Sequence, residues 1–330
     1  TKDAKALGLK RGMPYFKVRG LCKAKGVAVL SSNYELYQSM SGRFQRTVAA
    51  MVPKMESYSI DEVFCDVSGI ADDDPEKITE LAQAVRSRVL KWTGIPTCAG
   101  VAPTKTLAKL CDHFAKTYPV YDGVVNWFGL SAKRREKALS ITSVKEIWGI
   151  GGRTQEKLEG MRIRTALDFA RMDPWVVRLH FGVVLERTLR EINGVACIPL
   201  EENAQAKQQI VRTRSFGQAC SDLKSVITAV SVRMTEAVRT LRAQKSAAKT
   251  VGVLFHTDPF RQDLPQYGCS PFLQLEMPSA DILTLTGAAV DLVRSNWREG
   301  FEYKKAGVWL TDLSPAGSGF VPDSLFSSAD

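Results

Sequence analysis

The sequence lacks the residue patterns on which several classes of protein depend. Its seven cysteines form no C-x-x-C pair, which argues against a zinc site and against a disulfide framework. Its three histidines are scattered, so neither a histidine-based metal site nor a Ser-His-Asp triad is expected. No apolar run reaches the length of a membrane span, and no signal peptide is recognisable. These absences favour a cytoplasmic protein.

Positive charge, in contrast, is abundant. The 330 residues carry a net charge of +10 and have a pI near 9.2, which suggests a polyanionic partner. The excess lies in residues 1–200, because residues 201–330 hold equal numbers of basic and acidic side chains. Nucleic-acid binding in the second part would therefore depend on local arrangement of charge. The chain is long enough for about two to four domains.

Residues 58–66 read Y-S-I-D-E-V-F-C-D, and their aromatic and β-branched neighbours predict a strand or tight hairpin with acid at its centre. Burying Asp61 and Glu62 among apolar residues is costly unless something pairs their charge. A divalent cation would do so, because hard cations take carboxylate oxygens. Neighbours on a regular strand face opposite ways, so the backbone must turn for both to meet one metal. The alternative is a strand edge with two solvated acids.

A strand over residues 97–102 is followed by a helix whose first turn contains Lys105. The N-terminus of a helix offers free N–H groups and positive potential, and a lysine there adds a charge suited to phosphate. Lys109, one turn on, is expected to support the helix or the acids. The order of elements around the acids, β, α, β, β, α, β, is that of a ferredoxin-like unit.

Two further stretches suggest contact with DNA. Residues 144–161 read as a helix-hairpin-helix, in which glycines allow close approach of the backbone and the second helix points N–H groups at a phosphate. Residues 210–216 alternate and place Arg212 and Arg214 on one face, either as a solvated face or as a sheet laid on a DNA backbone. The candidate residues of the helix-hairpin-helix are Gly149, Gly151, Gly152 and Arg153.

Together these stretches resemble Y-family DNA polymerases of the UmuC (ImpB/MucB/SamB-like) subfamily. The match includes S-S-N-Y-E-L-Y at 31–37, S-I-D-E at 59–62 and G-V-A-P-T-K-T-L-A-K at 100–109. Further on it includes W-G-I-G at 148–151, V-L-E-R-T at 184–188 and K-A-G-V at 305–308. The resemblance implies an α+β, multi-domain right-hand fold. Its expected parts are a small fingers remnant (1–33), a ferredoxin-like palm (34–124), a helical thumb (125–200), a βαββαβ little finger (201–313) and a flexible tail (314–330).

The resemblance implies an error-prone translesion DNA polymerase subunit that carries out template-directed nucleotidyl transfer opposite damaged bases in the SOS response. It gives Asp61 and Glu62 the role of ligands in a two-metal Mg²⁺ site. It assigns the incoming triphosphate to Lys105 and Lys5. Implied partners are primer-template DNA, dNTP, a processed UmuD dimer and a RecA filament. A sliding clamp is a further implied partner, although the tail at 323–326 lacks the Gln that leads such a peptide in relatives.

One part of the family pattern is absent from these 330 residues. The sequence opens at Thr1, inside an expected helix, and the N-terminal motif D-x-N-x-F-Y-x-S is not found. The resemblance implies that this motif supplies a third metal-binding carboxylate and a central strand. We therefore expect a truncated chain with an open palm sheet and little or no activity alone. Two alternatives stay open: a non-catalytic DNA-binding remnant, and a palm-fold nucleotide cyclase, in which a helix-hairpin-helix would have no role.

Overall fold

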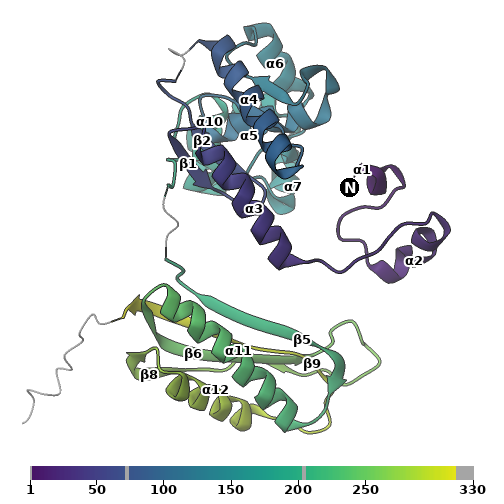
Figure 1. The fold of residues 1–330 in the computed structure, drawn as a ribbon, viewed down its shortest axis with the longest axis vertical. Coiled ribbons are helices and arrows are strands. Elements are labelled where there is room, and N and C mark those ends of the chain that lie inside the picture. Colours follow the sequence, from purple (N-terminus) through teal and green to yellow (C-terminus); the bar gives the residue numbers. More distant parts are fainter. Residues whose placement is uncertain (1, 71–73, 203–205, 317–330) are drawn as a thin grey trace, which may run out of the picture. The chain divides into compact units, whose positions relative to one another are not determined.

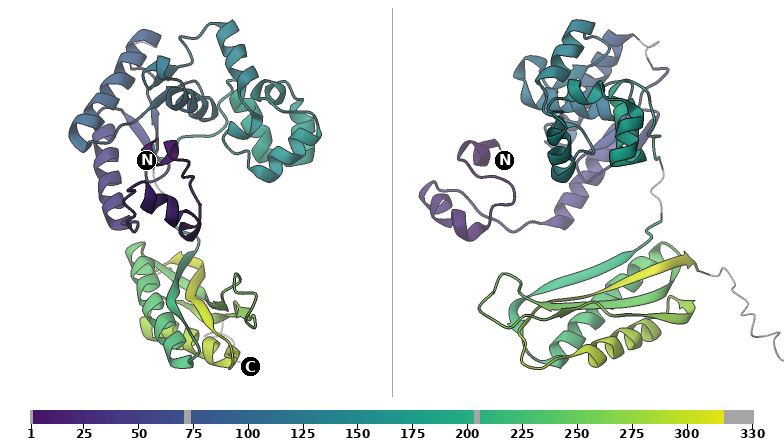
Figure 2. Two further views of the ribbon diagram at one scale, coloured as in Figure 1. Left: turned by 90° about the vertical axis from the view of Figure 1, so that its right-hand side faces the viewer. Right: turned by 180° about the vertical axis from the view of Figure 1, so that it is seen from behind.

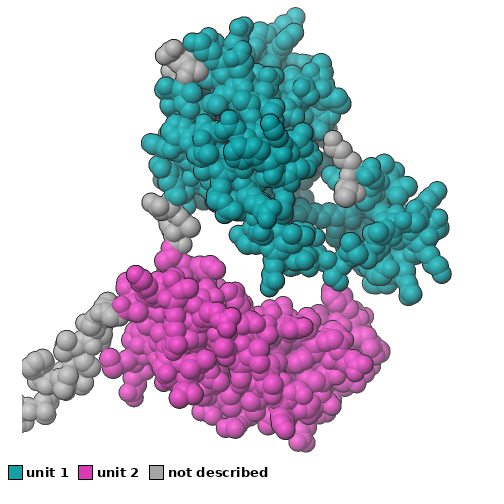
Figure 3. Space-filling view, viewed as in Figure 1, with its two compact units in different colours: residues 1–204 teal, residues 205–330 magenta. Residues whose placement is uncertain are grey.

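The computed structural model of the chain describes residues 2–70, 74–202 and 206–316. The chain divides into two compact units, residues 1–204 and residues 205–330 (Figure 3). Each unit is described by itself. The finer division into fingers, palm, thumb and little finger remains a prediction. The expected tail lies outside the described residues from 317 on, but residues 314–315 belong to a strand rather than to a tail.

The first unit contains ten α-helices and four short strands within its described residues (Figure 1). The helices are α1 Lys2–Ala6, α2 Tyr15–Ala24, α3 Tyr34–Ala49, α4 Pro75–Thr93, α5 Lys105–Thr117, α6 Ala132–Ile141, α7 Gly152–Gly160, α8 Ala166–Ala170, α9 Pro174–Phe181 and α10 Val183–Ile192. The strands are β1 Lys54–Ser57, β2 Val63–Asp66, β3 Ala99–Val101 and β4 Val124–Asn126, and two 3₁₀ helices are η2 Pro119–Tyr121 and η3 Val144–Glu146.

Local sequence explains where the longest of these helices begins and ends. Asp74 caps α4 by accepting the N–H of Glu76, and Pro75 occupies the first helical position, where its missing N–H costs nothing. Gly94 ends α4 in the left-handed conformation, with φ of 71°. Asp74 therefore serves as the cap of this helix. Residues 71–73 lie outside the described part of the chain.

The four strands of the first unit form two separate pairs. β1 and β2 pair antiparallel, β3 and β4 pair parallel, and in the described residues no backbone pairing joins the two. Of the expected order β, α, β, β, α, β, the first strand is missing, because residues 27–33 form neither helix nor strand; α3, β1, β2, α4 and β3 follow as expected. The β1–β2 hairpin is held by helices instead. It shares with α3 and α4 a small core around Phe44, Val48 and Val89. This packing fixes the hairpin on the helices.

The larger core of the first unit joins α5 to the helices that follow it. Buried side chains of α5, such as Leu107 and Phe114, lie in one cluster with Leu158, Phe169 and Leu189. Because α5 contributes to this cluster, the helical part of residues 125–200 is packed directly on α5. Figure 2 shows these helices gathered at one end of the first unit.

The second unit is an antiparallel sheet covered on one face by two helices (Figure 1, Figure 2). The strand order is β5-β9-β6-β7, and β8 also pairs with β6. Apolar residues of both helices and of alternate strand positions form one buried cluster. The predicted βαββαβ order is present with one addition, the two-residue strand at Gly268–Cys269. The elements are β5 Ile210–Cys220, α11 Leu223–Ala243, β6 Ser246–Thr257, β7 Gly268–Cys269, β8 Phe272–Ser279, α12 Ile282–Asn296 and β9 Tyr303–Pro315.

The other face of this sheet carries an aromatic pair. The rings of Phe272 and Trp309 lie 5.7 Å apart, and Trp309 donates its indole N–H to Ser270. Gly252 lies beneath the indole, where an added Cβ would come within 2.0 Å of the ring. Only glycine therefore lets Trp309 lie flat across β6. Among the described helices of the whole chain, none is both long enough and apolar enough to cross a membrane.

Candidate active site

The acid stretch forms a hairpin with both carboxylates in its turn. β1 and β2 pair with Lys54 opposite Asp66 at one end and Ser57 opposite Val63 at the other, so residues 58–62 form the connection. The N–H of Ser59 donates to the carbonyl of Glu62 at 3.0 Å, closing the turn, and the Ser59 hydroxyl donates to Asp61 Oδ1 at 2.8 Å. The expected tight hairpin is confirmed. In a turn, neighbouring carboxylates are not forced onto opposite faces.

The two acids differ in their surroundings. Asp61 is exposed, whereas the side chain of Glu62 is 31% exposed and its Oε1 accepts a hydrogen bond from Lys109 Nζ at 2.6 Å. Lys116 Nζ lies 3.8 Å from the same oxygen. The sequence left open whether the two acids are solvated or paired with a cation. In the structure Asp61 is solvated, whereas Glu62 is paired with lysines of α5.

Three lysines form a stripe along one face of α5. Lys105, Lys109 and Lys116 are separated by four and seven residues, which places them above one another on a helix. Burial acts to lower the pKa of Lys116, but the hydrogen bond and charge of Asp112, together with Glu62, outweigh it, so its pKa is raised. Lys116 thus stays cationic beside the acids. Lys116 was not among the residues predicted from the sequence, although its spacing of seven residues from Lys109 places both on one face of the helix.

The N-terminus of α5 is closed, contrary to the expectation of free N–H groups there. Thr104 caps the helix by accepting the N–H of Leu107 at 3.2 Å. Glu191 Oε2 accepts the N–H of Thr106 at 3.0 Å, and the Glu191 side chain is fully buried. A protein carboxylate thus occupies the position that an anionic ligand would take at a helix N-terminus.

Lys105 itself is engaged away from the acid turn. Its Nζ forms an ion pair with Glu56 of β1 and donates to the carbonyl of Pro199 at 2.7 Å. Its side chain is 10% exposed. Lys5, the other expected triphosphate contact, lies in the exposed helix α1, and the described structure records no contact between Lys5 and either acid. The lysines brought to the acids are Lys109 and Lys116.

Aromatic rings connect the hairpin to the helix-hairpin-helix region. Trp148 donates its indole N–H to the hydroxyl of Tyr58 at 2.9 Å. The ring centroids of Tyr58, Phe64 and Trp148 lie 5.3 to 5.6 Å apart, at distances typical of aromatic packing. Burial raises the pKa of the Cys65 thiol to about 11, so this neighbour stays protonated and is not a thiolate ligand.

The acid turn has the ligand chemistry of a Mg²⁺ site. Asp61 and Glu62 offer carboxylate oxygens, and Mg²⁺ in phosphate-transfer sites is commonly held by one or two carboxylates, with water and substrate phosphates completing its shell. Within the described ranges, no group of three or more His, Cys, Asp or Glu side chains gathers as a metal site. The two residues therefore fit a metal that arrives with its nucleotide better than one held by protein alone.

The predicted helix-hairpin-helix is present with a shorter first element. Its first element is the 3₁₀ helix η3, and α7 follows the glycine turn. Gly149 has a φ of 91°, and an added Cβ at Gly151 or Gly152 would meet nothing within 4 Å. α7 has no side-chain cap, and in the described part of the chain no acceptor is recorded for the N–H groups of Gly152 and Arg153. This helix N-terminus is open where that of α5 is closed.

The expected DNA face of β5 needs a correction. Arg212 shares its side of the strand with the buried Ile210, and its Nη2 donates to Thr240 of α11 at 2.8 Å. Arg212 therefore lies on the helix-covered face, and Arg214 follows it by alternation but is exposed. The open face carries Val211 and Thr213 instead.

Lys305, which was not among the residues predicted from the sequence, lies on that open face. On β9, Ala306 and Val308 are buried toward the helices, so Lys305 projects from the opposite side and pairs in register with Ser215. It shares this face with Trp309. The open face thus combines one lysine with the aromatic pair.

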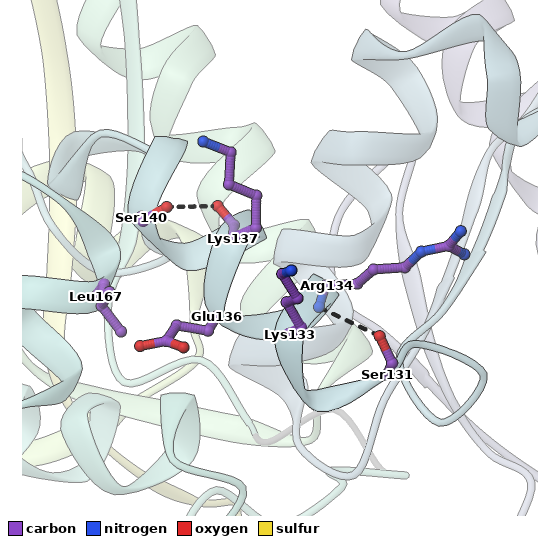
Figure 4. A pocket seen from close by; sticks show the side chains of 7 residues that line it. All are labelled: Ser131, Lys133, Arg134, Glu136, Lys137, Ser140 and Leu167. Carbon is purple, nitrogen blue, oxygen red and sulfur yellow. Dashed lines mark hydrogen bonds between the residues drawn. The ribbon is translucent and has the colours of Figure 1, made fainter.

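A surface groove lies away from the acids, along α6 (Figure 4). Arg134 and Lys137 extend in different directions in Figure 4 and do not converge on one point. The groove is therefore not a candidate for the phosphate site. Its lining residues are Ser131, Lys133, Arg134, Glu136, Lys137, Ser140 and Leu167.

Comparison with protein families gives two matches that cover both units. The impB/mucB/samB family matches residues 1–113, and the impB/mucB/samB family C-terminal domain matches residues 207–320. The two matches leave out the helices of residues 114–206.

Individual proteins give matches along nearly the whole chain. It is 41% identical over 318 residues to Protein UmuC of Salmonella typhimurium, covering 96% of this chain and 74% of that protein. It is 43% identical over 311 residues to Protein MucB of Escherichia coli, covering 94% and 73%. DNA polymerase IV of Corynebacterium diphtheriae is 26% identical over 329 residues, covering 99% and 68%. Among solved structures, a Y-family DNA polymerase chimera of Dbh and Dpo4 superposes with a TM-score of 0.74 at 22% identity, covering 96% and 86%.

Proposed function

Because the chain belongs to the impB/mucB/samB family and has the fold of a Y-family DNA polymerase, we propose that it is an error-prone translesion polymerase of SOS mutagenesis and DNA repair. The reaction is template-directed nucleotidyl transfer, in which a primer 3′-hydroxyl attacks the α-phosphate of a dNTP and pyrophosphate leaves. The acid turn of the β1–β2 hairpin is the site of this chemistry.

The observation that carries the proposal is the position of the acid turn against the lysine stripe. Glu62 holds Lys109 at 2.6 Å and lies 3.8 Å from Lys116, while Asp61 beside it is exposed. Carboxylates suited to a cation thus lie next to ammonium groups suited to a triphosphate. A metal-bound nucleotide supplies a cation for the carboxylates and phosphates for the lysines. Glu62 and the lysines can therefore exchange their contacts with each other for contacts with the substrate.

The chain's own residues have distinct roles in this proposal. Asp61 and Glu62 would hold the divalent metals that Y-family polymerases generally use, and such ions would stabilise negative charge that develops in phosphoryl transfer. Lys109 and Lys116 neutralise the triphosphate, in place of the Lys105 and Lys5 that the sequence suggested. The hydroxyl of Ser59 orients Asp61 through its 2.8 Å hydrogen bond.

Primer extension tests the proposed function. A chain that also contains the N-terminal motif D-x-N-x-F-Y-x-S is expected to extend a primer with dNTP and Mg²⁺ past an abasic site in the template. Binding of primer-template without any extension would favour the non-catalytic DNA-binding alternative instead. The relatives and the structure compared above give the cyclase alternative no support, and formation of a cyclic product from ATP without primer would be needed to restore it.

Lys116→Met is expected to raise the KM for dNTP by about tenfold or more while primer-template affinity stays within about twofold. A change of about 1.4 kcal/mol in the interaction with the triphosphate corresponds to a factor of ten. Steady-state incorporation of a single nucleotide measures it. The matched control is Lys105→Met on the same helix face, which should leave this KM unchanged. A larger KM effect for the control than for Lys116→Met would assign the triphosphate to Lys105.

DNA binding is proposed to involve the open N-terminus of α7 and the open face of the second unit. Each is open within its own unit as far as the described residues go: α7 has no capping side chain, and both helices of the second unit lie on the opposite face of its sheet. Phosphates accept hydrogen bonds from such N–H groups without regard to sequence. Contact of this kind suits an enzyme that must accept any template.

Gly152→Pro is expected to weaken primer-template binding about three- to tenfold without destabilising the protein. Gly152 is the first residue of α7, where proline fits and no intrahelical hydrogen bond is lost. The extended ψ of 172° at Gly151 suits a residue before proline. The substitution thus removes one N–H donor, a loss of about 1 kcal/mol. Gly152→Ala keeps the N–H and should bind DNA as the wild type does, and equal binding by Gly152→Pro would exclude a phosphate contact there.

Protein partners are proposed by family resemblance alone. They are a processed UmuD dimer and a RecA filament, with a sliding clamp as a further candidate. The tail proposed for clamp binding lies outside the described residues. Co-purification of the natural protein with processed UmuD tests the first of these partners.

A further inference from the structure

Residues 197–201, which we call the strap, connect the last helix of the first unit to the second unit without forming a helix or strand. After α10 the strap runs across the N-terminus of α5. Its backbone polar groups are nevertheless bound by side chains from three separate elements, β1, α5 and α10. A connection that is merely a linker would leave these groups to water.

The first end of the strap is held by the buried Glu191. Its Oε1 accepts the N–H groups of Cys197 at 2.8 Å and Ile198 at 3.1 Å, while Oε2 accepts that of Thr106 on α5. The carboxylate therefore joins the strap directly to the helix that carries the lysine stripe. Charge-assisted hydrogen bonds of this kind are stronger than neutral ones.

The second end is held by the ion pair of Lys105 and Glu56. Lys105 Nζ donates to the carbonyl of Pro199 at 2.7 Å, and Glu56 Oε2 accepts the N–H of Glu201 at 2.8 Å. The side chains of Lys105 and Glu56 are only 10% and 11% exposed, so neither is a solvated surface charge. The lysine thus links the β1 strand of the acid hairpin to the strap.

We propose that Lys105 and Glu56 form a clamp that fixes the strap and with it the point from which the second unit is tethered. Lys105 is then a positioning residue and touches no nucleotide. The proposal rests on the proposed polymerase function only in its effect on DNA binding, because the clamp itself is a contact within the first unit.

The length of the tether shows why the clamp matters. The second unit is first held at Lys207, whose carbonyl accepts a hydrogen bond from Gln244. An extended chain spans about 3.3–3.6 Å per residue, so the reach from Glu201 to Lys207 is at most about 20 Å. With the clamp released the last fixed point becomes Ile198, and the reach grows to about 30 Å. Effective concentration falls as roughly the −3/2 power of tether length, so the second unit would be diluted about twofold at the DNA.

Hydrogen exchange of the whole chain, resolved to single amides by mass spectrometry, tests the clamp without any need for catalysis. In the wild type the amide of Glu201 should be protected, and Lys105→Met should raise its exchange at least about tenfold. The amides of Cys197 and Ile198 should stay protected, because Glu191 holds them. Lys109→Met, one turn along α5, is the matched control and should leave the strap unchanged. An unprotected Glu201 amide in the wild type, or one unaffected by Lys105→Met, would overturn the proposal.

A kinetic measurement separates positioning from a direct role. Lys105→Met should raise the primer-template Kd about twofold and leave the KM for dNTP unchanged. Glu201→Pro removes the strap N–H that Glu56 accepts and leaves the side chains of Lys105 and Glu56 in place. It should therefore raise the primer-template Kd by the same factor, even if Lys105→Met fails to fold. A tenfold rise in KM with a protected Glu201 amide would make Lys105 a nucleotide ligand. Failure of the wild type to bind primer-template would count against the proposed function, while the exchange result would still decide the clamp.

Discussion

Asp61→Asn is expected to abolish nucleotide incorporation, with kcat reduced by at least about a thousandfold and primer-template affinity within about twofold of the wild type. The substitution removes the charge that a divalent cation needs, and electrostatic stabilisation of this kind is commonly worth several kcal/mol in phosphoryl transfer. The amide oxygen can still accept the hydroxyl of Ser59, which now donates to Asp61 Oδ1 at 2.8 Å. The turn and the fold should therefore persist.

Single-turnover incorporation by a chain that also contains the N-terminal motif D-x-N-x-F-Y-x-S measures the loss caused by Asp61→Asn. Asp66→Asn is a matched control on the same hairpin, because Asp66 lies on β2 and accepts the backbone N–H of Ser68 rather than facing the turn. It should retain at least about half of the wild-type rate. A rate for Asp61→Asn within about tenfold of the wild type would remove Asp61 from the chemistry.

The largest loss of stability is expected for Glu191→Ala. The Glu191 side chain is fully buried and accepts the N–H groups of Thr106, Cys197 and Ile198. The buried N–H of Thr106 left without a partner costs about 1–3 kcal/mol, and the half-buried N–H groups of Cys197 and Ile198 cost less because water can reach them. The free energy of unfolding of the first unit should therefore fall by about 2–4 kcal/mol. For a unit of this size the corresponding fall in Tm is about 10 °C.

Scanning calorimetry of the whole chain measures this loss as a shift of one transition, since the second unit has its own core. Glu186→Ala, on the same helix, is the matched control. Glu186 is also buried, but its partners Arg178 and Arg190 are more than half exposed, so its removal leaves no buried donor unpaired. That variant should lose about 1 kcal/mol or less. Equal shifts for the two glutamates would show that the hydrogen bonds of Glu191 contribute little.

Much of the fold could be read from the sequence because local chemistry specifies it. Asp74 and Pro75 mark the start of α4, and Gly94 marks its end. Alternating and helical apolar patterns predicted the βαββαβ order of the second unit, which the structure shows with one additional two-residue strand. The acid hairpin was predictable for the same reason, since a turn within S-I-D-E is needed if both carboxylates are to meet one ion.

The sequence was less informative about which partner each charged side chain meets. Lys105 was assigned to a triphosphate from its place in the first turn of α5, but Glu191, which closes that helix N-terminus, comes 85 residues later than Thr106. Lys116 has the right spacing from Lys109, yet nothing local shows that their face of the helix meets Glu62. Contacts between such distant residues depend on packing and not on propensity.

The sequence by itself determined the family, most of the order of the elements and the hairpin that carries the two acids, because these depend on residue types at short spacing. Only the tertiary structure decided that Lys109 and Lys116, rather than Lys105, lie beside the acids, and that Arg212 lies beneath a helix. The physical reason is that periodicity shows which side chains share a face, whereas burial of that face is settled by the elements that pack against it.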